Sequence, residues 1–486
     1  MGYTTLAILA ILLYTILNLY VGLGRGYKKE VVSSASGYFL GGGTDYFILF
    51  FTTAATWFST WLYMGAVGSF YKNGIGFIAG MLWQLVIMMF MGIFGIKFWI
   101  MANKYDYITP ADLLDDYYQS KALRLIVAIG QLIFCIPYLM AQVTGTGLAV
   151  STLTGGIIPY WGGVIYAAVV VGLYVYFGGF RSQAWVDTMQ GIMFTIILWV
   201  SVILMLLRPE VGGISGLFIK LAERTNLLKY LTLPNYWNWS MYLSFFIIQS
   251  FGGFFAPYVW QRMYAAKNGN IVRKMSGTLG PFYTLVIMLP VMLAGFCGAI
   301  LFPKIDNPDN ILVATMAKYY PIWGIFVVIG IMAAGMSTIS SILVSASSII
   351  SVDLVKKYKP DMTTVQLRNL GRYIVLILLA VAVAFSMVKI QAILILVNVA
   401  LAGFAQLVFP VIGVFAWKRA TKEGAIAGLI VGLVLTIFFT VVIPNPLHTM
   451  AGIWGLLGNA TVFFGVSLLT NSIPSREIQN KFTILQ

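Results

Sequence analysis

Charged residues are scarce in this sequence. Only 9% of its 486 residues are Asp, Glu, Lys or Arg, whereas soluble domains carry about 25%. Hydrophobic residues make up 60% of the chain and the mean hydropathy is +0.90. Lipid rather than water must therefore solvate much of the surface. These values exclude an ordinary soluble globular protein and indicate a protein embedded in a lipid bilayer.

Histidine and cysteine are almost absent. The single histidine is His448, and the two cysteines, Cys135 and Cys297, lie inside apolar runs, which is typical of buried thiols rather than a disulfide. The sequence has no HExxH motif, no pair of intramembrane aspartates and no Ser–His partnership. A membrane-embedded enzyme would need such a set. We therefore expect no catalytic residues and no enzyme activity.

The basic residues explain the formal charge of +15. They are dispersed between apolar stretches, without a basic patch interleaved with aromatic residues, so we expect no nucleic-acid partner. Most of the 30 Lys and Arg residues fall in one set of alternate loops. The positive-inside rule then places the N-terminus outside and the C-terminus in the cytoplasm of a plasma (inner) membrane protein.

Apolar segments recur along the whole chain. A helix needs about 20 apolar residues to cross the bilayer, and thirteen segments approach that length: 4–24, 45–71, 74–103, 122–151, 160–179, 184–207, 239–259, 276–302, 319–350, 369–388, 390–417, 424–443 and 449–470. This pattern predicts an all-α polytopic membrane protein with thirteen transmembrane helices, and an odd number agrees with termini on opposite sides.

Two of these segments are interrupted. Hydroxyl-bearing and small residues crowd the stretch from Thr52 to Thr60, and Gln249–Gly253 is followed by Pro257. Glycine weakens a helix and proline removes a hydrogen-bond donor. Breaks at membrane depth survive where they line a cavity, and paired breaks in two halves of a chain are typical of a transporter's central site. Close helix packing through small residues is the alternative explanation for either break alone.

A polar stripe and an isolated acid complete the set of unusual features. Small and hydroxyl-bearing residues recur at helical spacing, and they are Ala334, Ser337, Ser341, Ser345 and Ser348. Hydroxyls together with carbonyls freed by an unwound helix are the hard ligands that an alkali cation prefers, although tight packing explains the stripe equally well. Asp187 begins an apolar segment, where an acid usually faces a cavity or a partner, or else lies at the solvated interface.

Motifs of a known family occur in order along the chain. They are Tyr176-Phe177-Gly178-Gly179-Phe180 with Trp185-Val186-Asp187-Thr188 and Gln190, Pro257 with Gln261-Arg262 and Ala265-Ala266-Lys267, Ala333-Ala334-Gly335-Met336-Ser337-Thr338, and Ala402-Gly403-Phe404 with Pro410, Trp417-Lys418-Arg419 and Gly424-Ala425. On these residues the sequence resembles the sodium:solute symporter family. The stretches 57–74 and around Asn398 are similar to those of its pantothenate and monocarboxylate carriers.

The resemblance implies the inverted-repeat fold of the bacterial leucine transporter, with discontinuous core helices 1 and 6. Residues 45–207 and 239–417 would form the two five-helix repeats. Residues 1–44 would form an extra helix and a cytoplasmic loop, and residues 208–238 an extracellular loop. Residues 418–486 would form two further helices and a short cytoplasmic tail. The resemblance also implies symport of a small organic solute by alternating access.

The ligands of the coupling ion, Na⁺, are also implied by the resemblance. One sodium site would use backbone oxygens of Ala55, Phe58 and Ala334 with the hydroxyls of Ser337 and Thr338. A second sodium site would use Asp187, Ser340 and Ser341. Proton coupling remains the alternative that the sequence leaves open.

The solute site departs from the family pattern, because Trp57 stands where some relatives have a small polar or acidic residue. By position we expect it to be lined by Trp57, Ser59, Thr60, Gln84, Tyr138, Gln249, Gly252, Gly253 and Asn398. No Arg or Lys is expected near this site, so a substrate anion would rely on hydroxyls, freed amides and half-helix N-termini. One carboxylate is feasible on these terms and two are not.

We therefore favour a monocarboxylate-bearing solute such as pantothenate, a short monocarboxylate or an amino acid. A sugar is the alternative, because Gln249 matches a position that contacts the sugar in sugar-carrying members of the family. Proline carriers of the family place aromatic residues at the positions of Gln249 and Gly253, so these two residues weaken a proline assignment. A solute-gated channel or a sensor is a reading of another class. A channel needs selectivity rings that are not seen. We expect the protein to work as a monomer.

Overall fold

The computed structural model describes residues 2–223, 231–232, 238–388 and 393–483. Within these ranges the regular structure consists of helices, apart from one isolated β-bridge between Thr44 and Ala266. The prediction of an all-α protein is confirmed. Ten of the described helices are long and apolar enough to cross a membrane, or twelve if each of two bent helix pairs counts as one span.

The helices of the first half of the chain follow the predicted segments. They are α1 (Tyr3–Leu19), α2 (Ala35–Leu40), α3 (Tyr46–Trp57), α4 (Val67–Asn73), α5 (Ala79–Phe90), α6 (Ile96–Tyr105), α7 (Pro110–Tyr118), α8 (Lys121–Leu153), α9 (Tyr160–Leu206) and α10 (Gly213–Glu223). The π-helical turn η2 (Leu62–Ala66) links α3 to α4.

The second half continues in the same manner. Its helices are α11 (Trp239–Phe255), α12 (Pro257–Ala265), α13 (Gly269–Pro281), α14 (Leu289–Leu301), α15 (Ile311–Tyr319), α16 (Pro321–Ile349), α17 (Thr364–Val388), α18 (Ile393–Phe404), α19 (Val408–Phe415), α20 (Lys422–Val441), α21 (Ala451–Leu469) and α22 (Arg476–Thr483).

Helix α9 carries two of the predicted segments, 160–179 and 184–207. It runs for 47 residues but bends at Gly179, whose φ of 55° and ψ of −143° are not helical. A Cβ there would lie 2.2 Å from the carbonyl oxygen of Tyr38, so both the backbone angles and the close approach require glycine. The total of thirteen spans stays a prediction.

The two predicted breaks are confirmed. Helix α3 and the helical stretch Leu62–Phe77 meet at 59°, and α11 and α12 meet at 44°. Phe58 and Ser59 leave the helix between the first pair, and Ala256, with φ −61° and ψ 135°, interrupts the second immediately before Pro257. The residue before a proline is driven out of the α region, which accounts for the second break directly.

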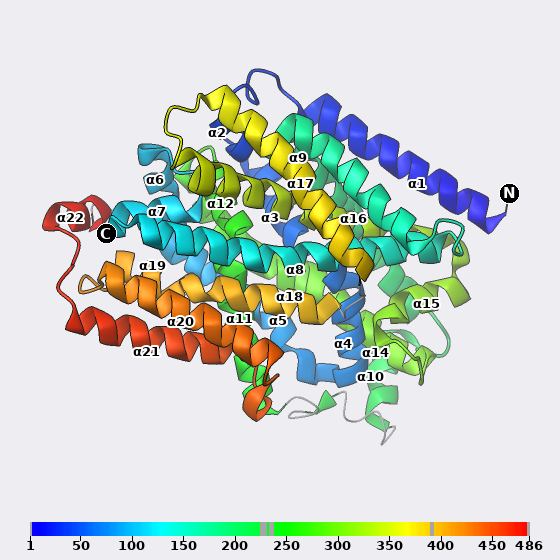
Figure 1. The fold of residues 1–486 in the computed structure, drawn as a ribbon. Coiled ribbons are helices and arrows are strands. Elements are labelled where there is room, and N and C mark those ends of the chain that lie inside the picture. The colour runs from blue at the N-terminus through cyan, green and yellow to red at the C-terminus, as the bar shows by residue number, and fades with distance from the viewer. Residues whose placement is uncertain (1, 224–230, 233–237, 389–392, 484–486) are drawn as a thin grey trace.

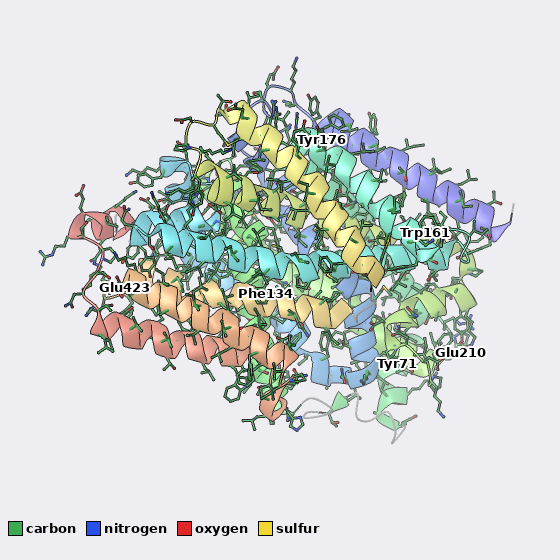
Figure 2. All side chains as sticks on the ribbon, in the orientation of Figure 1. Tyr71, Phe134, Trp161, Tyr176, Glu210 and Glu423 are labelled. Atoms are coloured by element: carbon green, nitrogen blue, oxygen red, sulfur yellow. The ribbon has the colours of Figure 1, made fainter. Side chains whose placement is uncertain are left out.

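Helix α16 lies at the centre of the bundle, and all residues of its apolar 18-residue stretch are buried. In the corresponding stretches of α1, α20 and α21, only 28–33% of the residues are buried. Figure 1 shows α1 at one flank and the pair α20 and α21 at the other, with the two chain ends at opposite ends of the molecule. Figure 2 shows Glu210 and Glu423 at those two ends, with Phe134 between them. The exposed apolar surface of the flanking helices therefore faces the lipid.

Several short helices were not predicted. The segment expected as an extracellular loop, 208–238, contains α10, while its residues 224–230 and 233–237 lie outside the described part of the chain. The first residues of the segment predicted at 390–417 also lie outside it. Helices α2, α7, α15 and α22 connect or end the spans and have 6–9 residues each. They are too short to be found by a search for membrane-spanning apolar runs.

Candidate cation and solute sites

Two hydroxyls of α16 meet the C-terminal end of α3. Ser337 Oγ donates to the carbonyls of Ala55 and Ala334, both at 3.0 Å. Thr338 Oγ1 donates to the carbonyls of Thr56 at 3.0 Å and Ala334 at 3.1 Å. All five residues are buried. The structure therefore brings four residues of the predicted sodium site together, where α3 ends and α16 passes it.

The fifth residue of that prediction, Phe58, directly follows the last residue of α3 and has non-helical angles, φ −82° and ψ 44°. The last carbonyls of a helix have no intrahelical partner and carry a partial negative charge. Because α3 ends inside the bundle, its final carbonyls are available to the α16 hydroxyls. The same carbonyls are suited to a small cation.

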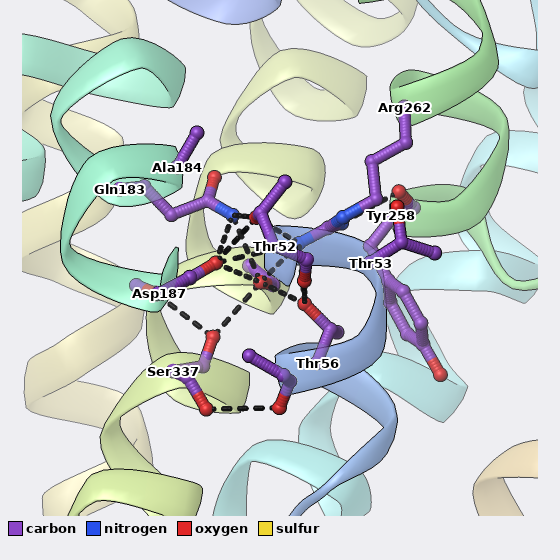
Figure 3. Close-up of polar contacts among 12 residues, drawn as sticks. Thr52, Thr53, Thr56, Gln183, Ala184, Asp187, Tyr258, Arg262 and Ser337 are labelled. Carbon is purple, nitrogen blue, oxygen red and sulfur yellow. Dashed lines mark hydrogen bonds and ion pairs between the residues drawn. The ribbon is translucent and has the colours of Figure 1, made fainter. Parts of the chain in front are cut away.

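A second cluster surrounds Asp187, which is fully buried on α9. Thr52 Oγ1 and Gln183 Nε2 donate to its Oδ2 at 2.7 and 2.8 Å. Ser340 donates to Oδ1 at 3.1 Å and Ser341 to Oδ2 at 3.4 Å. The three residues predicted for a second sodium site, Asp187, Ser340 and Ser341, thus lie together, and Asp187 is buried rather than solvated at an interface. Figure 3 shows Asp187 beside Thr52 and Gln183.

The same cluster contains a cation of the protein itself. The Arg262 side chain extends from α12 towards Asp187 (Figure 3) and is 1% exposed. Its Nη2 lies 3.5 Å from Asp187 Oδ2 and donates to Ser341 Oγ at 2.7 Å and to Thr56 Oγ1. No Arg or Lys was expected near the solute site, and Arg262 lies in the Asp187 cluster rather than in the lining of the solute cavity. Arg262 lies five residues after Pro257 on the half-helix α12, whose nine residues are all buried.

The broken helices also enclose a small central cavity. It is lined by Trp57, Ser59, Trp61, Trp83, Tyr138, Gln249, Gly253, Tyr258, Val397 and Leu401. Five of the residues predicted to line the solute site are among them: Trp57, Ser59, Tyr138, Gln249 and Gly253. None of the lining residues carries a charge.

The other four predicted lining residues have different surroundings. Thr60 donates through both its backbone N–H and its hydroxyl to Gln142 Oε1 at 2.9 Å. Gln84 is buried outside the lining. A Cβ on Gly252 would lie 2.1 Å from the Leu401 carbonyl oxygen, so this glycine allows α11 to approach α18. The fourth, Asn398, lies just beyond the cavity.

Buried donors without partners characterise the cavity wall. The indole N–H groups of Trp57, Trp61 and Trp83 have no hydrogen-bond partner among the described residues. An indole nitrogen can only donate, and a buried donor left unpaired costs about 1–3 kcal/mol. In this conformation the cavity measures about 10 Å³, room for one water at most. A molecule larger than water would fit only if the cavity were enlarged, and the three indole N–H groups are donors free to pair with an acceptor.

A hydrogen bond separates this cavity from a larger one. Gln249 Nε2 donates to Asn398 Oδ1 at 2.6 Å. Gln249 lines the central cavity, whereas Asn398 lines a second cavity of about 440 Å³ between α11, α18 and the α20–α21 connection. That connection and the start of α11 are predicted to be extracellular. The Gln249–Asn398 bond thus lies between the central cavity and the predicted outside.

Sequence reasoning missed several residues of these sites. Gln142 holds the α3 break, and Gln183 holds Asp187, but a buried glutamine within an apolar helix gives no specific pattern. Trp61 and Trp83 looked like ordinary apolar residues. Arg262 could have been found, because it follows a predicted break by only five residues.

Comparison with known sequences identifies relatives along nearly the whole chain. The model of the sodium:solute symporter family matches residues 38–432. The sodium/pantothenate symporter of Escherichia coli K12 is 28% identical over 88% of this chain and 89% of its own. The sodium/proline symporter of Staphylococcus aureus JH9 is 26% identical over 92% of this chain and 88% of its own.

Solved structures share the fold. A substrate-bound, outward-open sodium-coupled sialic acid symporter superimposes with a TM-score of 0.81 at 19% identity, covering 97% of this chain and 99% of that one. A nucleobase-cation-symport-1 family transporter in a closed conformation gives a TM-score of 0.56 at 12% identity, covering 92% and 98%. At these identities the likeness concerns the fold alone, and it confirms the predicted leucine-transporter-like architecture.

Proposed function

The chain belongs to the sodium:solute symporter family, and on that premise we propose that it imports a small monocarboxylate-bearing solute together with sodium by alternating access. As a member of this family it is a multi-pass membrane transporter rather than an enzyme. The observation that carries the proposal is an uncharged cavity with unpaired buried donors, next to a helix end whose carbonyls are suited to a cation.

The sodium ion would bind where α3 ends. The carbonyls of Ala55, Phe58 and Ala334 and the hydroxyls of Ser337 and Thr338 provide oxygen ligands, which hard cations prefer. The negative end of the α3 dipole favours positive charge there. In the present structure the two hydroxyls donate to these carbonyls, so a bound ion would turn their lone pairs towards itself.

The solute would bind at the broken helices. Trp57 and Ser59 lie within four residues of Ala55, so a carboxylate in this cavity would be close to the sodium ion. The indole donors supply hydrogen bonds, and the N-terminus of α12, which no side chain caps, adds a favourable dipole. One carboxylate fits these means, because the lining contains no cationic side chain.

The aromatic walls of the cavity support a second candidate within the same class. The faces of Trp57, Trp61 and Tyr258 could receive an ammonium group by cation–π attraction. An amino acid would then use its carboxylate for the sodium and the indole donors, and its ammonium for the rings. Zwitterions therefore belong in any substrate screen.

Alternating access would follow from the two breaks. Sodium binding between α3 and α16 would favour a state open to the outside, and solute binding would permit one helix bundle to rock against the other. The Gln249–Asn398 hydrogen bond would close the central cavity from the larger outer one. The protein would work as a monomer, with its N-terminus outside and its C-terminus in the cytoplasm.

A thermal-shift screen of the purified protein tests this proposal. Pantothenate, short monocarboxylates, amino acids and hexoses would each be added in sodium chloride and in potassium chloride at equal ionic strength. A ligand at about 100 times its Kd stabilises the folded state by about 2.7 kcal/mol. We expect a monocarboxylate or an amino acid to stabilise only in sodium.

Other outcomes of the screen have definite meanings. Stabilisation by a hexose alone would replace the carboxylate proposal with a sugar symporter. Equal stabilisation by the carboxylate in both salts, increasing as the pH is lowered, would replace sodium coupling with proton coupling.

A further inference from the structure

The oxygen atoms around one nitrogen of Arg262 form an unusual group. Nη2 lies 3.2 Å from the Thr52 carbonyl, 3.1 Å from Thr52 Oγ1, 2.7 Å from Ser341 Oγ and 3.5 Å from Asp187 Oδ2, and it also donates to Thr56 Oγ1. This nitrogen carries two hydrogens but has five oxygen neighbours. Five oxygen atoms are more than the two hydrogens of this guanidinium nitrogen can use. A set of five hard oxygen ligands is instead typical of a site for a hard cation.

The charge balance of the cluster permits one cation. Asp187 is the only carboxylate in ion-pair contact with Arg262 among the described residues, and both side chains are buried. Two positive charges beside one buried carboxylate would leave an unpaired charge in a region of low dielectric, which is very costly. Arg262 and a second sodium ion therefore cannot occupy the cluster together.

We propose that Arg262 is a tethered cation that competes with a second sodium ion for the oxygens of Thr52, Thr56, Asp187 and Ser341. The inference rests on the proposed sodium coupling and concerns a separate site. While Nη2 is in place, only the site at Ala55 and Ser337 is open to sodium. When Arg262 withdraws, the Asp187 cluster becomes a sodium site.

The exchange would also change how the broken helices are held. Through Arg262, α12 is bonded to α3, α9 and α16, because Thr52 and Thr56 lie on α3, Asp187 on α9 and Ser341 on α16. Sodium in place of Nη2 would leave α3, α9 and α16 joined but would release α12. Occupancy of the cluster would thus be coupled to movement of the half-helix that follows Pro257.

Sodium titrations of purified variants, read by thermal shift, test this competition. We expect the linkage coefficient, which is the number of ions bound as given by the slope of the stabilisation against ln[Na⁺], to be near one in the unaltered protein and to approach two in Arg262→Gln. Arg262→Lys retains the charge and should behave like the parent. The double variant Asp187→Asn/Arg262→Gln loses the cluster's charge and should return the coefficient to about one. Lys267→Gln, which removes an exposed cation beside α12, is the matched control.

Removal of one member of a buried ion pair is strongly destabilising, so Arg262→Gln is also to be prepared with and without sodium. We expect sodium to restore its folded yield, while the double variant folds in either salt. An Arg262→Gln protein that folds and titrates like the parent overturns the inference. The inference is also overturned if sodium does not restore the folding of Arg262→Gln while the double variant folds. It is overturned as well if the parent protein already binds two sodium ions.

These outcomes separate the inference from the proposed function. If the parent binds sodium and Arg262→Gln gains no further binding, the competition is refuted and sodium coupling stands. If only Arg262→Gln responds to sodium, the tethered cation is supported and the site at Ala55 and Ser337 is refuted.

Discussion

Removal of the Ser337 hydroxyl is the sharpest test of the proposed sodium site. In Ser337→Ala one of the five proposed ligands is lost, while the carbonyls of Ala55, Phe58 and Ala334 and the hydroxyl of Thr338 remain. A hydrogen bond or ligand contact to a charged group contributes about 1.5–3 kcal/mol. Since 1.4 kcal/mol corresponds to tenfold in affinity, the Kd for sodium should rise roughly 10- to 100-fold.

The measurement has to separate sodium binding from stability. Ser337 makes two 3.0 Å hydrogen bonds in the structure, so its loss also lowers the basal stability by about 1 kcal/mol for each bond. The midpoint of a sodium titration, followed by thermal shift, reports the affinity independently of that loss. At saturating sodium, a tenfold weaker Kd removes about 1.4 kcal/mol of the stabilisation that sodium confers.

Ser347→Ala provides the matched control. Ser347 lies on the same helix, is also fully buried, and donates to the Val344 carbonyl at 2.9 Å, away from α3. This variant should lose basal stability and keep the parental sodium midpoint. The reasoning is refuted if the midpoint of Ser337→Ala is unchanged, or if Ser347→Ala shifts it equally.

Three further predictions concern the solute cavity and the packing of α11. Gln249→Ala breaks the 2.6 Å hydrogen bond to Asn398 that would close the central cavity, so bound radiolabelled solute should be released faster. Asn398→Ala removes the same bond and should have the same effect. An unchanged release rate in both variants would contradict a gating role for the bond. Trp57→Phe keeps the ring but loses an unpaired donor, so solute affinity should fall about tenfold or more, as measured by sodium-dependent binding; parental affinity would show that the indole N–H does not meet the solute. Gly252→Ala places a Cβ 2.1 Å from a backbone carbonyl of α18 and should lower the free energy of unfolding by roughly 1–3 kcal/mol. The control Gly277→Ala, whose Cβ would have nothing within 4 Å, should be neutral or stabilising. Equal unfolding midpoints for the two variants would contradict the close approach of α11 to α18.

The spans and breaks were predictable because bilayer thickness and backbone hydrogen bonding act on local sequence. A run of about 20 apolar residues identifies a span wherever it occurs. Pro257 ends α11 at the residue before it through a steric effect that needs no tertiary information. The sodium-site residues were expected from the resemblance to the family, because a helical spacing of hydroxyls specifies one face of α16 but does not show that this face meets the end of α3.

The lining of the cavity was only partly predictable, because it depends on how helices approach one another. Thr60 belongs to the hydroxyl-rich break, yet its hydroxyl is bonded to Gln142 on α8. Gly252 lies in the expected segment but faces the backbone of α18. Trp83 lines the cavity, although nothing in its local sequence separates it from lipid-facing tryptophans. Side-chain direction at a break is set by tertiary packing, which periodicity does not encode.

The proposed sodium ion and the proposed carboxylate would be coupled by their opposite charges. The cavity lining is uncharged, and Arg262 is already paired with Asp187, so nothing in the described lining neutralises a bound sodium ion or a bound carboxylate. In the proposed mode of binding each ligand would therefore have the other as its counter-ion. At separations of roughly 4–8 Å and an effective dielectric of about 20, their attraction amounts to about 2–4 kcal/mol. By linkage, sodium raises solute affinity by the same factor as the solute raises sodium affinity. A neutral sugar would gain none of this attraction, so a strong coupling between sodium and solute in a binding assay would favour a carboxylate over a sugar.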